Sequence, residues 1–257
     1  MSDFIPTPER QRQILSWLTR QGRLSVTEIV EQFSISEATA RRDLESLAAQ
    51  GKVQRVHGGV MAVEQAPPEL PILERNNEQP EEKARIGLSA ANLIGDKETV
   101  FLGSGTTVLA VARNLRDRSN LTVITNSLPV LNMLAGINGI TVISLGGMLR
   151  ESEMSFIGHI TEQSLNEIRA DKVIMGTRGL SLEHGLTNDY LQETLTDRAI
   201  LKIGREVILV ADHTKVNRVA TVLLAPLDVM HTLVTDSQAD KKLLQMLKKK
   251  GIRVLVA

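Results

Sequence analysis

The sequence predicts an α/β protein with an N-terminal winged helix-turn-helix domain and a C-terminal, mostly parallel α/β domain. Three observations lead to this prediction. Three short helical patterns precede a Gly-Gly hairpin signal, a proline-rich stretch follows, and the remaining chain alternates between strand and helix patterns. We therefore expect a first domain over 1–65, a linker over 66–80 and a second domain over 81–257.

The composition excludes several classes of protein. Of the 257 residues, 42% are hydrophobic and 2% are aromatic, which is enough for an aliphatic core in a small and a medium domain. The chain has no cysteine, so disulfides, Cys-ligated zinc and thiol catalysis are excluded. No apolar run is long enough to predict a membrane span. The 30 basic and 30 acidic residues cancel, so net charge gives no argument for a nucleic-acid partner.

The first two helices are predicted by their apolar spacing and by one capping motif. Residues 9–20 place apolar side chains at helical intervals. Ser25 and Glu28 are typical of a capping box, in which each side chain accepts from the other residue's backbone amide. The apolar residues that follow fall on one face of a helix: Val26, Ile29, Val30 and Phe33.

The third helix is expected to begin after Ser36, which caps it, and to be the helix that enters a DNA groove. Its apolar side, Ala40, Leu44 and Leu47, can pack on the first two helices. Ala38 and Arg42 lie on the opposite side, with Thr39 and Arg41 on its flanks, so the exposed half combines small residues with two arginines. Small residues allow close approach, and guanidinium groups can bind guanine edges or phosphates. Two helices, a short turn and such a third helix predict a helix-turn-helix.

The hairpin that follows is predicted to be the wing. The segment KVQRVHGGVMAV, residues 52–63, has valines on both sides of a Gly-Gly pair. We expect Lys52, Arg55 and His57 to lie near the DNA backbone.

A pair of arginines on a helix is more often a solvated surface than a DNA contact. Residues 8–63 hold eight basic and six acidic residues, which is a weak excess. The ordered pattern of three helices and a hairpin is what favours DNA binding. The candidate DNA contacts are Ser36, Ala38, Thr39, Arg41, Arg42, Lys52, Arg55 and His57.

The second domain should contain a sheet covered by helices on both faces, because β-branched runs alternate with helical patterns. Before it, four prolines between Pro67 and Pro80 indicate a linker that becomes ordered by about Glu81. The expected helices span 82–94, 106–115, 129–135, 158–168 and 191–203, with a lysine-rich helix near the C-terminus. The expected strands span 99–102, 121–125, 140–145, 171–176, 206–211, 231–236 and 252–257.

The segment FLGSGTTV is expected to bind an anion. It reads as a strand, a Gly-Ser-Gly turn and a helix start, where backbone amides and the hydroxyls of Ser104, Thr106 and Thr107 can surround a phosphate. It lacks the lysine of a Walker A loop and the third glycine of a dinucleotide fingerprint. A plain tight turn is the alternative.

Polar residues at other strand ends should meet this loop, since the carboxyl ends of parallel strands face one crevice. These residues predict a phosphorylated small molecule as ligand. His184 and His213 do not form a metal site by themselves, and we expect neither metal nor cofactor. The candidate ligand-binding residues are Ser104, Gly105, Thr106, Thr107, Asn126, Arg150, Asp212 and Lys215.

Several motifs together resemble the DeoR family of bacterial sugar-metabolism repressors. They include SEATARRDL, VQRVHGGV, FLGSGTTVLAVA, SLGGMLRESEMSFIG and ILVADHTKVNR, and they cover nearly the whole chain. The resemblance implies a cytoplasmic, homo-oligomeric repressor that releases double-stranded operator DNA when a phosphorylated sugar or polyol binds. The chain departs from the family at Ala40, where many members have Ile, and at Gly103, where many have Asp. The first departure trims a packing contact, and the second removes a carboxylate beside the phosphate loop.

The second domain is also similar to ribose-5-phosphate isomerase, which leaves an enzyme with an added nucleic-acid-binding module as the alternative. An alignment with that enzyme places Arg198 where its catalytic glutamate stands. The residues 176–179 also lack the enzyme's carboxylates. Because arginine stays protonated and cannot act as a base, we expect a regulator and not an enzyme. The sequence does not separate a repressor from an activator or dual regulator.

Overall fold

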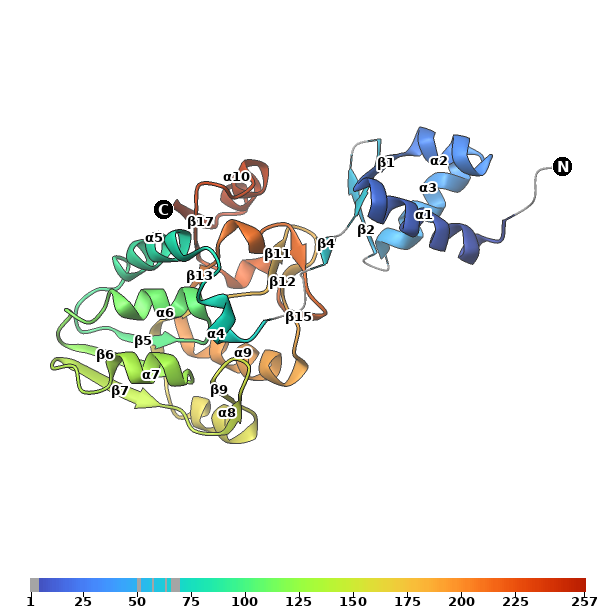
Figure 1. Cartoon of the computed structure of the whole chain (residues 1–257). Coiled ribbons are helices and arrows are strands. Elements are labelled where there is room, and N and C mark those ends of the chain that lie inside the picture. The colour runs from blue at the N-terminus through green and yellow to red at the C-terminus, as the bar shows by residue number, and fades with distance from the viewer. Residues whose placement is uncertain (1–4, 50–51, 57, 63, 66–69) are drawn as a thin grey trace. The chain divides into compact units, whose positions relative to one another are not determined.

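The structure, a computed structural model, describes residues 5–49, 52–56, 58–62, 64–65 and 70–257. The chain divides into two compact units, Met1–Glu64 and Gln65–Ala257 (Figure 1). Among the described residues, no helix has the length and apolar character that crossing a bilayer requires.

The first unit is a winged helix. Its elements are α1 (Thr7–Gln21), β1 (Arg23–Ser25), α2 (Val26–Phe33), α3 (Glu37–Ala49), β2 (Val53–Val56) and β3 (Gly59–Ala62), followed by the short β4 (Glu64–Gln65). The three helices and the β2–β3 hairpin confirm the prediction from the sequence. The structure adds β1, which pairs antiparallel with β3 and completes a three-stranded sheet in the order β1-β3-β2.

Local capping and a small aliphatic core explain why these residues form these helices. Ser25 Oγ accepts from the amide of Glu28 at 3.1 Å, and Glu28 Oε2 accepts from the amide of Ser25 at 2.6 Å, so the predicted capping box is present. Ser36 Oγ accepts from the amide of Thr39 at 3.2 Å and begins α3. The apolar side of α3 is buried with residues of the other helices: Ile14, Leu18, Ile29, Ala40, Leu44 and Leu47.

The second unit is built on a seven-stranded parallel sheet in the order β17-β16-β13-β10-β5-β6-β7. In chain order its strands are β5 (Thr99–Leu102), β6 (Leu121–Thr125), β7 (Ile140–Ser144), β10 (Ala170–Met175), β13 (Gly204–Val210), β16 (Thr232–Thr235) and β17 (Arg253–Val256). All seven were predicted, because each is a β-branched run between helical patterns.

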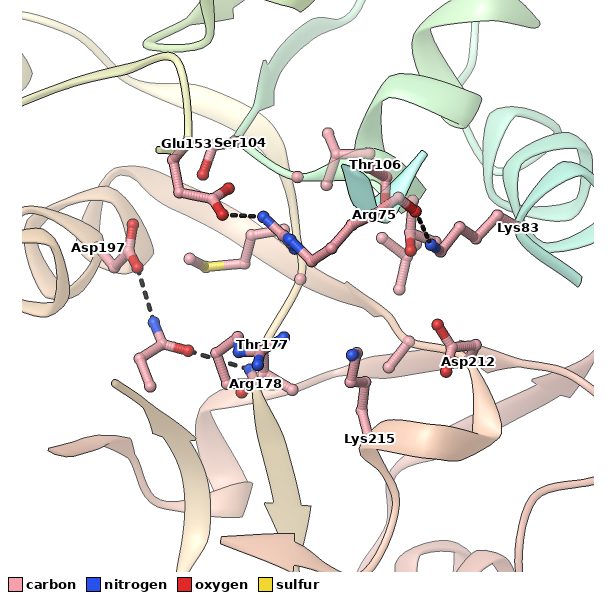
Figure 2. Close-up of a pocket in the computed structure, with 18 of the residues that line it drawn as sticks. Arg75, Lys83, Ser104, Thr106, Glu153, Thr177, Arg178, Asp197, Asp212 and Lys215 are labelled. Atoms are coloured by element: carbon pink, nitrogen blue, oxygen red, sulfur yellow. Dashed lines mark hydrogen bonds and ion pairs between the residues drawn. The ribbon is translucent and has the colours of Figure 1, made fainter. Parts of the chain in front are cut away.

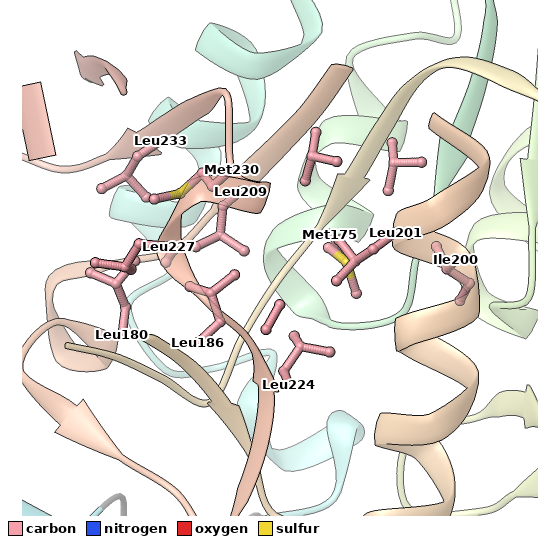
Figure 3. Packing of buried hydrophobic residues seen from close by; sticks show 14 of the residues in the cluster. Met175, Leu180, Leu186, Ile200, Leu201, Leu209, Leu224, Leu227, Met230 and Leu233 are labelled. Carbon is pink, nitrogen blue, oxygen red and sulfur yellow. The ribbon is translucent and has the colours of Figure 1, made fainter. Parts of the chain in front are cut away.

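Helices cover both faces of this sheet, as predicted. They are α5 (Pro80–Ala91), α6 (Thr106–Arg113), α7 (Leu128–Leu134), α8 (His159–Asn166), α9 (Leu191–Ile203) and α10 (Lys241–Lys249). One buried cluster joins α5, α6 and α7 to the sheet. A second cluster joins the sheet to α8, α9 and α10 and contains Met175, Ile200 and Leu209 (Figure 3). The carboxyl ends of the strands are thereby held in fixed register.

Short elements supplement the sheet and were not predicted. They are α4 (Ile72–Arg75), β8 (Met148–Arg150), β9 (Ser155–Ile157), β11 (Gly179–Ser181), β12 (Gly185–Asn188), β14 (Arg218–Val219), β15 (Val222–Ala225) and two 3-10 turns, η1 (His213–Lys215) and η2 (Leu227–Val229). Strands β11, β12 and β15 form a small antiparallel sheet. Strands β8 and β9 form a hairpin.

Helix α4 lies inside the stretch that we expected to be an irregular linker. Its Ile72 is 1% exposed and its Arg75 is 8% exposed, so both side chains are packed against the second unit. Four residues are too few for a periodic apolar signal, and a helix this short depends on tertiary contacts. This placement brings Arg75 into the pocket described below.

Candidate DNA-binding surface and ligand pocket

The exposed side of α3 carries the residues that the sequence predicted for DNA contact. Ser36, Ala38, Arg41 and Arg42 are exposed, and Thr39 is half-buried. Arg41 forms an ion pair with Glu37 one turn earlier, with 2.5 Å between Nη2 and Oε1. The small residues and both guanidinium groups therefore lie on a surface that a DNA groove can approach.

Two of the three residues predicted for the wing, Lys52 and Arg55, are described by the structure. Lys52 is exposed, and Arg55 is half-buried with its Nη1 3.4 Å from the carbonyl oxygen of Arg41. Arg55 therefore connects the wing to α3. His57 lies outside the described residues, so its predicted role stays a prediction.

A buried ion pair that the sequence reasoning missed fixes α3 against α1. Arg10 Nε and Asp43 Oδ2 are 2.6 Å apart, and their side chains are 5% and 4% exposed. Gln11 Nε2 donates to the other carboxylate oxygen of Asp43 at 3.2 Å. Separating a buried ion pair leaves uncompensated charges and is costly. The pair therefore stabilises one orientation of α3 relative to α1.

The pocket of the second unit is built around the turn between β5 and α6. Gly105 has φ +106° and precedes the helix that begins at Thr106. The first amides of a helix have no partner within the helix, and the helix dipole favours an anion there. The side chains of Thr106 and Thr107, the first two residues of this helix, are buried. The loop therefore has the local geometry of an anion site.

Other strand ends and α4 complete the pocket around this loop (Figure 2). Both cationic and anionic side chains line it. The polar lining residues outside the loop are Arg75, Glu78, Lys83, Glu153, Thr177, Arg178, Asn188, Asp189, Glu193, Asp197, Asp212 and Lys215. A second pocket shares Glu78, Arg178, Asp212 and Lys215 with it.

Lys215 supplies a cation that is available to a ligand. Its Nζ makes no hydrogen bond or ion pair with the residues that the structure describes, and Figure 2 shows it directed into the pocket. Burial lowers the pKa of Lys215, and the neighbouring Arg178 and Arg75 lower it further, while Asp212 and Glu78 oppose this shift. An anion beside Nζ would offset both the burial and the repulsion between cations.

Lys83 is a second buried cation at the same place. Its Nζ donates to the carbonyl oxygen of Arg75 at 2.7 Å. Burial lowers the pKa of Lys83, Asp212 raises it and Lys215 lowers it, so the two lysines repel one another. Both lysines therefore favour a negatively charged occupant.

Most of the pocket's carboxylates already have partners. Arg75 Nη2 forms an ion pair with Glu153, and Arg178 Nε lies 3.2 Å from Asp189 Oδ2. Asp197 Oδ2 accepts from Asn188 Nδ2 at 2.9 Å. These interactions orient the polar wall of the pocket before a ligand enters.

The structure brings together six of the eight residues predicted for ligand binding: Ser104, Gly105, Thr106, Thr107, Asp212 and Lys215. Asp212 Oδ1 accepts from the amide of Thr214 at 2.9 Å, which fixes the turn that carries Lys215.

Asn126 and Arg150 do not line the pocket. Asn126 is buried, its Nδ2 donates to the carbonyl oxygen of Phe156 at 3.0 Å, and its Oδ1 has no partner among the described residues. Arg150 pairs with Glu193 and lies 4.7 Å from the ring centre of Tyr190. Arg150 therefore holds a lining residue in place without facing the pocket.

Arg198, which the alignment placed at the position of the isomerase's catalytic glutamate, does not line the pocket. Its Nε donates at 3.2 Å to the carbonyl oxygen of Leu224 in β15, and Asp197 lines the pocket in its place. A shift of one residue along a helix turns the side chain by about 100°, so a sequence alignment that slips by one changes the face. The pocket also contains carboxylates that the sequence analysis did not name, among them Glu153, Glu193 and Asp197. Among the described residues, no group of His, Cys, Asp and Glu is arranged to hold a metal ion.

A winged helix joined in one chain to an α/β domain with a pocket at a helix N-terminus is typical of a ligand-responsive DNA-binding regulator. The chain belongs to the DeoR family. It matches the DeoR-like helix-turn-helix domain over residues 10–66 and the DeoR C-terminal sensor domain over residues 78–237.

Curated relatives match along nearly the whole chain. The transcriptional repressor AccR of Agrobacterium fabrum (strain C58) is 35% identical over 236 residues, which cover 91% of this chain and 91% of that protein. The glycerol-3-phosphate regulon repressor of Escherichia coli (strain K12) is 36% identical over 239 residues, covering 93% and 94%. Among solved structures, ribose 5-phosphate isomerase A of Methanocaldococcus jannaschii aligns with a TM-score of 0.40 and 18% identity, covering 54% of this chain and 55% of that one.

Proposed function

We propose that the protein is a sequence-specific, DNA-binding transcriptional repressor in the cytoplasm that releases its operator when a phosphorylated sugar or polyol binds the second unit. The observation that carries the ligand class is a pocket that contains the start of α6, with Ser104, Thr106 and Thr107, together with Lys215, whose Nζ makes no hydrogen bond or ion pair with the other described residues. Cations and amides of this kind bind phosphate. The name of the Escherichia coli relative, a glycerol-3-phosphate regulon repressor, supports the same class.

In this proposal the phosphate contacts the loop and Lys215, while Asp212, Asn188 and Asp197 hydrogen-bond the hydroxyl groups of the ligand. The carboxylates accept from hydroxyls, and the asparagine amide can donate or accept. A ligand with a phosphate at one end and hydroxyls along its chain fits this division.

The test is a thermal-shift screen of the full-length protein. Glycerol 3-phosphate, ribose 5-phosphate, fructose 1-phosphate and fructose 6-phosphate would each be compared with the same compound without phosphate. A ligand that binds only the native state raises its stability by mass action. At least one phosphorylated compound should raise the melting temperature and release a bound operator duplex. If no phosphorylated compound does more than its dephosphorylated partner, the proposal is wrong.

A sugar-phosphate isomerase activity is the second candidate, because Glu153, Glu193 and Asp197 line the pocket. A general base needs a carboxylate that is free to take a proton from the substrate. Glu153 and Glu193 are paired with Arg75 and Arg150, and Asp197 accepts from Asn188. These three carboxylates are therefore engaged by other side chains and are not free to act as the base. Incubation with ribose 5-phosphate should therefore give no ribulose 5-phosphate above the buffer rate.

We also propose that the repressor is a homo-oligomer assembled through its second unit. One winged helix reads only a few base pairs, so two copies related by a two-fold axis would read a repeated half-site. Sedimentation of the full-length protein at micromolar concentration should give a mass of at least a dimer. A monomer that binds its operator with one-to-one stoichiometry would contradict this.

A further inference from the structure

The segment in front of α5 supplies a side chain to the ligand pocket. The amide of Ile72 donates to the carbonyl oxygen of Ser152 at 2.7 Å, which holds α4 against the turn between β8 and β9. At the other end of α4, Lys83 Nζ donates to the carbonyl oxygen of Arg75. Arg75 is thus fixed at the pocket, although it follows closely after Gln65, where this unit begins.

The guanidinium of Arg75 is placed so that it can reach an anion at the loop. Figure 2 shows it extending across the pocket, with Thr106 and Ser104 on one side and Lys215 on the other. Its Nη2 forms an ion pair with Glu153, and the two side chains are only 9% and 4% exposed. The pair therefore lies within the pocket and is largely removed from solvent.

We propose that Arg75 is an effector-binding residue, and that Glu153 is the counter-ion that Arg75 leaves when a phosphate group enters the pocket. This inference rests on the function proposed above. A phosphate offers the planar guanidinium two oxygens, as the carboxylate does, and carries more negative charge. It therefore competes with Glu153 for the same donor groups.

The exchange gives the pocket a way to act on DNA binding. Arg75 lies in α4, and the chain before α4 continues into the winged helix. When Arg75 turns from Glu153 to the phosphate, α4 loses one of its attachments to the β8–β9 turn. A ligand that binds better to this second arrangement shifts the population toward it.

The distinguishing variant is Glu153→Gln. Glutamine keeps the size and one acceptor oxygen but removes the charge that competes with phosphate. In a thermal-shift titration of the full-length protein with inorganic phosphate, the half-saturating concentration should fall several-fold, although the unliganded protein should melt earlier. A pair with a merely structural role would lower the melting temperature and leave phosphate affinity unchanged.

Arg75→Gln should have the opposite effect on affinity. Losing a charge-assisted contact should raise the half-saturating phosphate concentration by about tenfold or more, and Arg75→Lys should restore part of the loss. Lys172→Gln is the matched control, because Lys172 pairs with Glu98 in the same unit and neither residue lines the pocket. The control should lose stability without a change in phosphate affinity.

The outcomes separate this inference from the proposed function. If the wild-type protein is not stabilised by phosphate or by any sugar phosphate, the proposed function fails, and this inference fails with it. If Lys215→Ala weakens phosphate binding but Arg75→Gln and Glu153→Gln leave it unchanged, only the inference is overturned. If Arg75→Gln does not fold, Glu153→Gln decides alone. Higher phosphate affinity in Glu153→Gln supports the inference, and unchanged affinity overturns it.

Discussion

Lys215 and Thr106 are the residues whose substitution should separate effector binding from DNA binding. Lys215→Ala removes the available cation, and Thr106→Val deletes a hydroxyl while nearly keeping the shape of a buried side chain. A hydrogen bond to a charged group contributes about 1.5–3 kcal/mol, so each variant should need at least about tenfold more effector. We expect normal operator affinity and poor release, measured by titrating a protein–operator complex with the best compound of the screen.

One result for Lys215→Ala and Thr106→Val would contradict this prediction. If both variants release the operator at the wild-type effector concentration, the phosphate is not bound at this loop. Lys172→Gln serves again as the control, since it removes a lysine of the same unit that does not line the pocket.

The affinity for phosphate should begin to fall at a lower pH than it would if Lys215 had the pKa of an ordinary lysine. Burial lowers the pKa of Lys215 below the usual 10.5, with Arg178 and Arg75 adding to the shift and Asp212 and Glu78 opposing it. Only protonated Lys215 attracts phosphate, so affinity should fall as the pH rises through this lowered pKa. Phosphate titrations from about pH 8 upward measure this effect, because phosphate has already lost its second proton there.

The stability of the unliganded protein should change in the opposite direction. In the pH range between the lowered pKa of Lys215 and 10.5, the unfolded chain binds more protons than the folded chain. Stability therefore rises with pH through that range, because the cost of burying the charge is relieved. In Lys215→Met this rise should be smaller, with only Lys83 contributing. A profile identical to that of the wild type would contradict the assignment to Lys215.

Arg42 and Glu37 should affect DNA affinity in opposite directions. Arg42→Ala should cost about 1–3 kcal/mol of discrimination if Arg42 contacts a base. If Arg42 instead contacts a phosphate, the slope of log affinity against log salt concentration should decrease in magnitude by about one. Glu37→Gln removes a negative charge from α3 and releases Arg41 from its ion pair, so general DNA affinity should rise. Operator and random duplexes of equal length, titrated at several salt concentrations, distinguish these cases.

Sequence reasoning found the pocket residues that immediately follow strands and missed those that arrive from elsewhere. Residues 104–107 and Lys215 were predictable because the ends of parallel strands share one crevice. Arg75 was not, because it stands in a segment without periodicity, and its burial comes from contacts with residues far along the chain such as Glu153. Asp197 was not predicted either, because it lies on a helix, α9, and not at the end of a strand.

The two glycines of the wing have different roles that the sequence could not separate. Gly58 has φ +78° and open space around it, so it serves the turn conformation. Gly59 pairs with Ser25, and a Cβ built on it would lie 2.1 Å from the carbonyl oxygen of Leu24 in the neighbouring chain segment. Its lack of a side chain is what allows β1 to join the sheet.

Gly59→Ala should therefore destabilise the winged helix much more than Gly58→Asn. Forcing a methyl group into a packed position costs about 1–3 kcal/mol, whereas asparagine tolerates the left-handed conformation. Urea denaturation followed by the fluorescence of Trp17 reports this unit, because Trp17 packs edge-on against Phe33, 6.4 Å between ring centres. Equal destabilisation by both variants would show that the turn, and not the contact with β1, is limiting.

The central strands of the main sheet were predictable because they are buried and read as β-branched runs. The edge strands β7 and β17 are more exposed but have a similar composition. The small sheet was not predictable. Strand β12 is buried along its whole length, yet its residues are Gly185, Leu186, Thr187 and Asn188, which show neither alternation nor an apolar run. Its polar side chains are satisfied by partners such as the amide of Ala220, which donates to Thr187 Oγ1 at 2.8 Å. Only the tertiary structure reveals these partners.

At the scale of the whole molecule, binding of operator and binding of effector must be linked reciprocally. If the effector lowers operator affinity by some factor, the operator lowers effector affinity by the same factor, and coupling of about 1–3 kcal/mol corresponds to about 5–150-fold. We therefore expect effector titrations of the full-length protein to shift to higher concentration in the presence of saturating operator. Calorimetric titrations with and without operator measure the factor, and operator titrations with and without effector must return the same value.

The controls for this linkage use the two units in turn. A random duplex at the same salt concentration should shift the effector titration less than the operator does, because only the operator selects the DNA-competent conformation. Arg42→Ala, on the exposed side of α3, should weaken the operator complex but leave effector affinity in the absence of DNA unchanged. If saturating operator leaves the effector affinity unchanged, the pocket does not control DNA binding, whatever it binds.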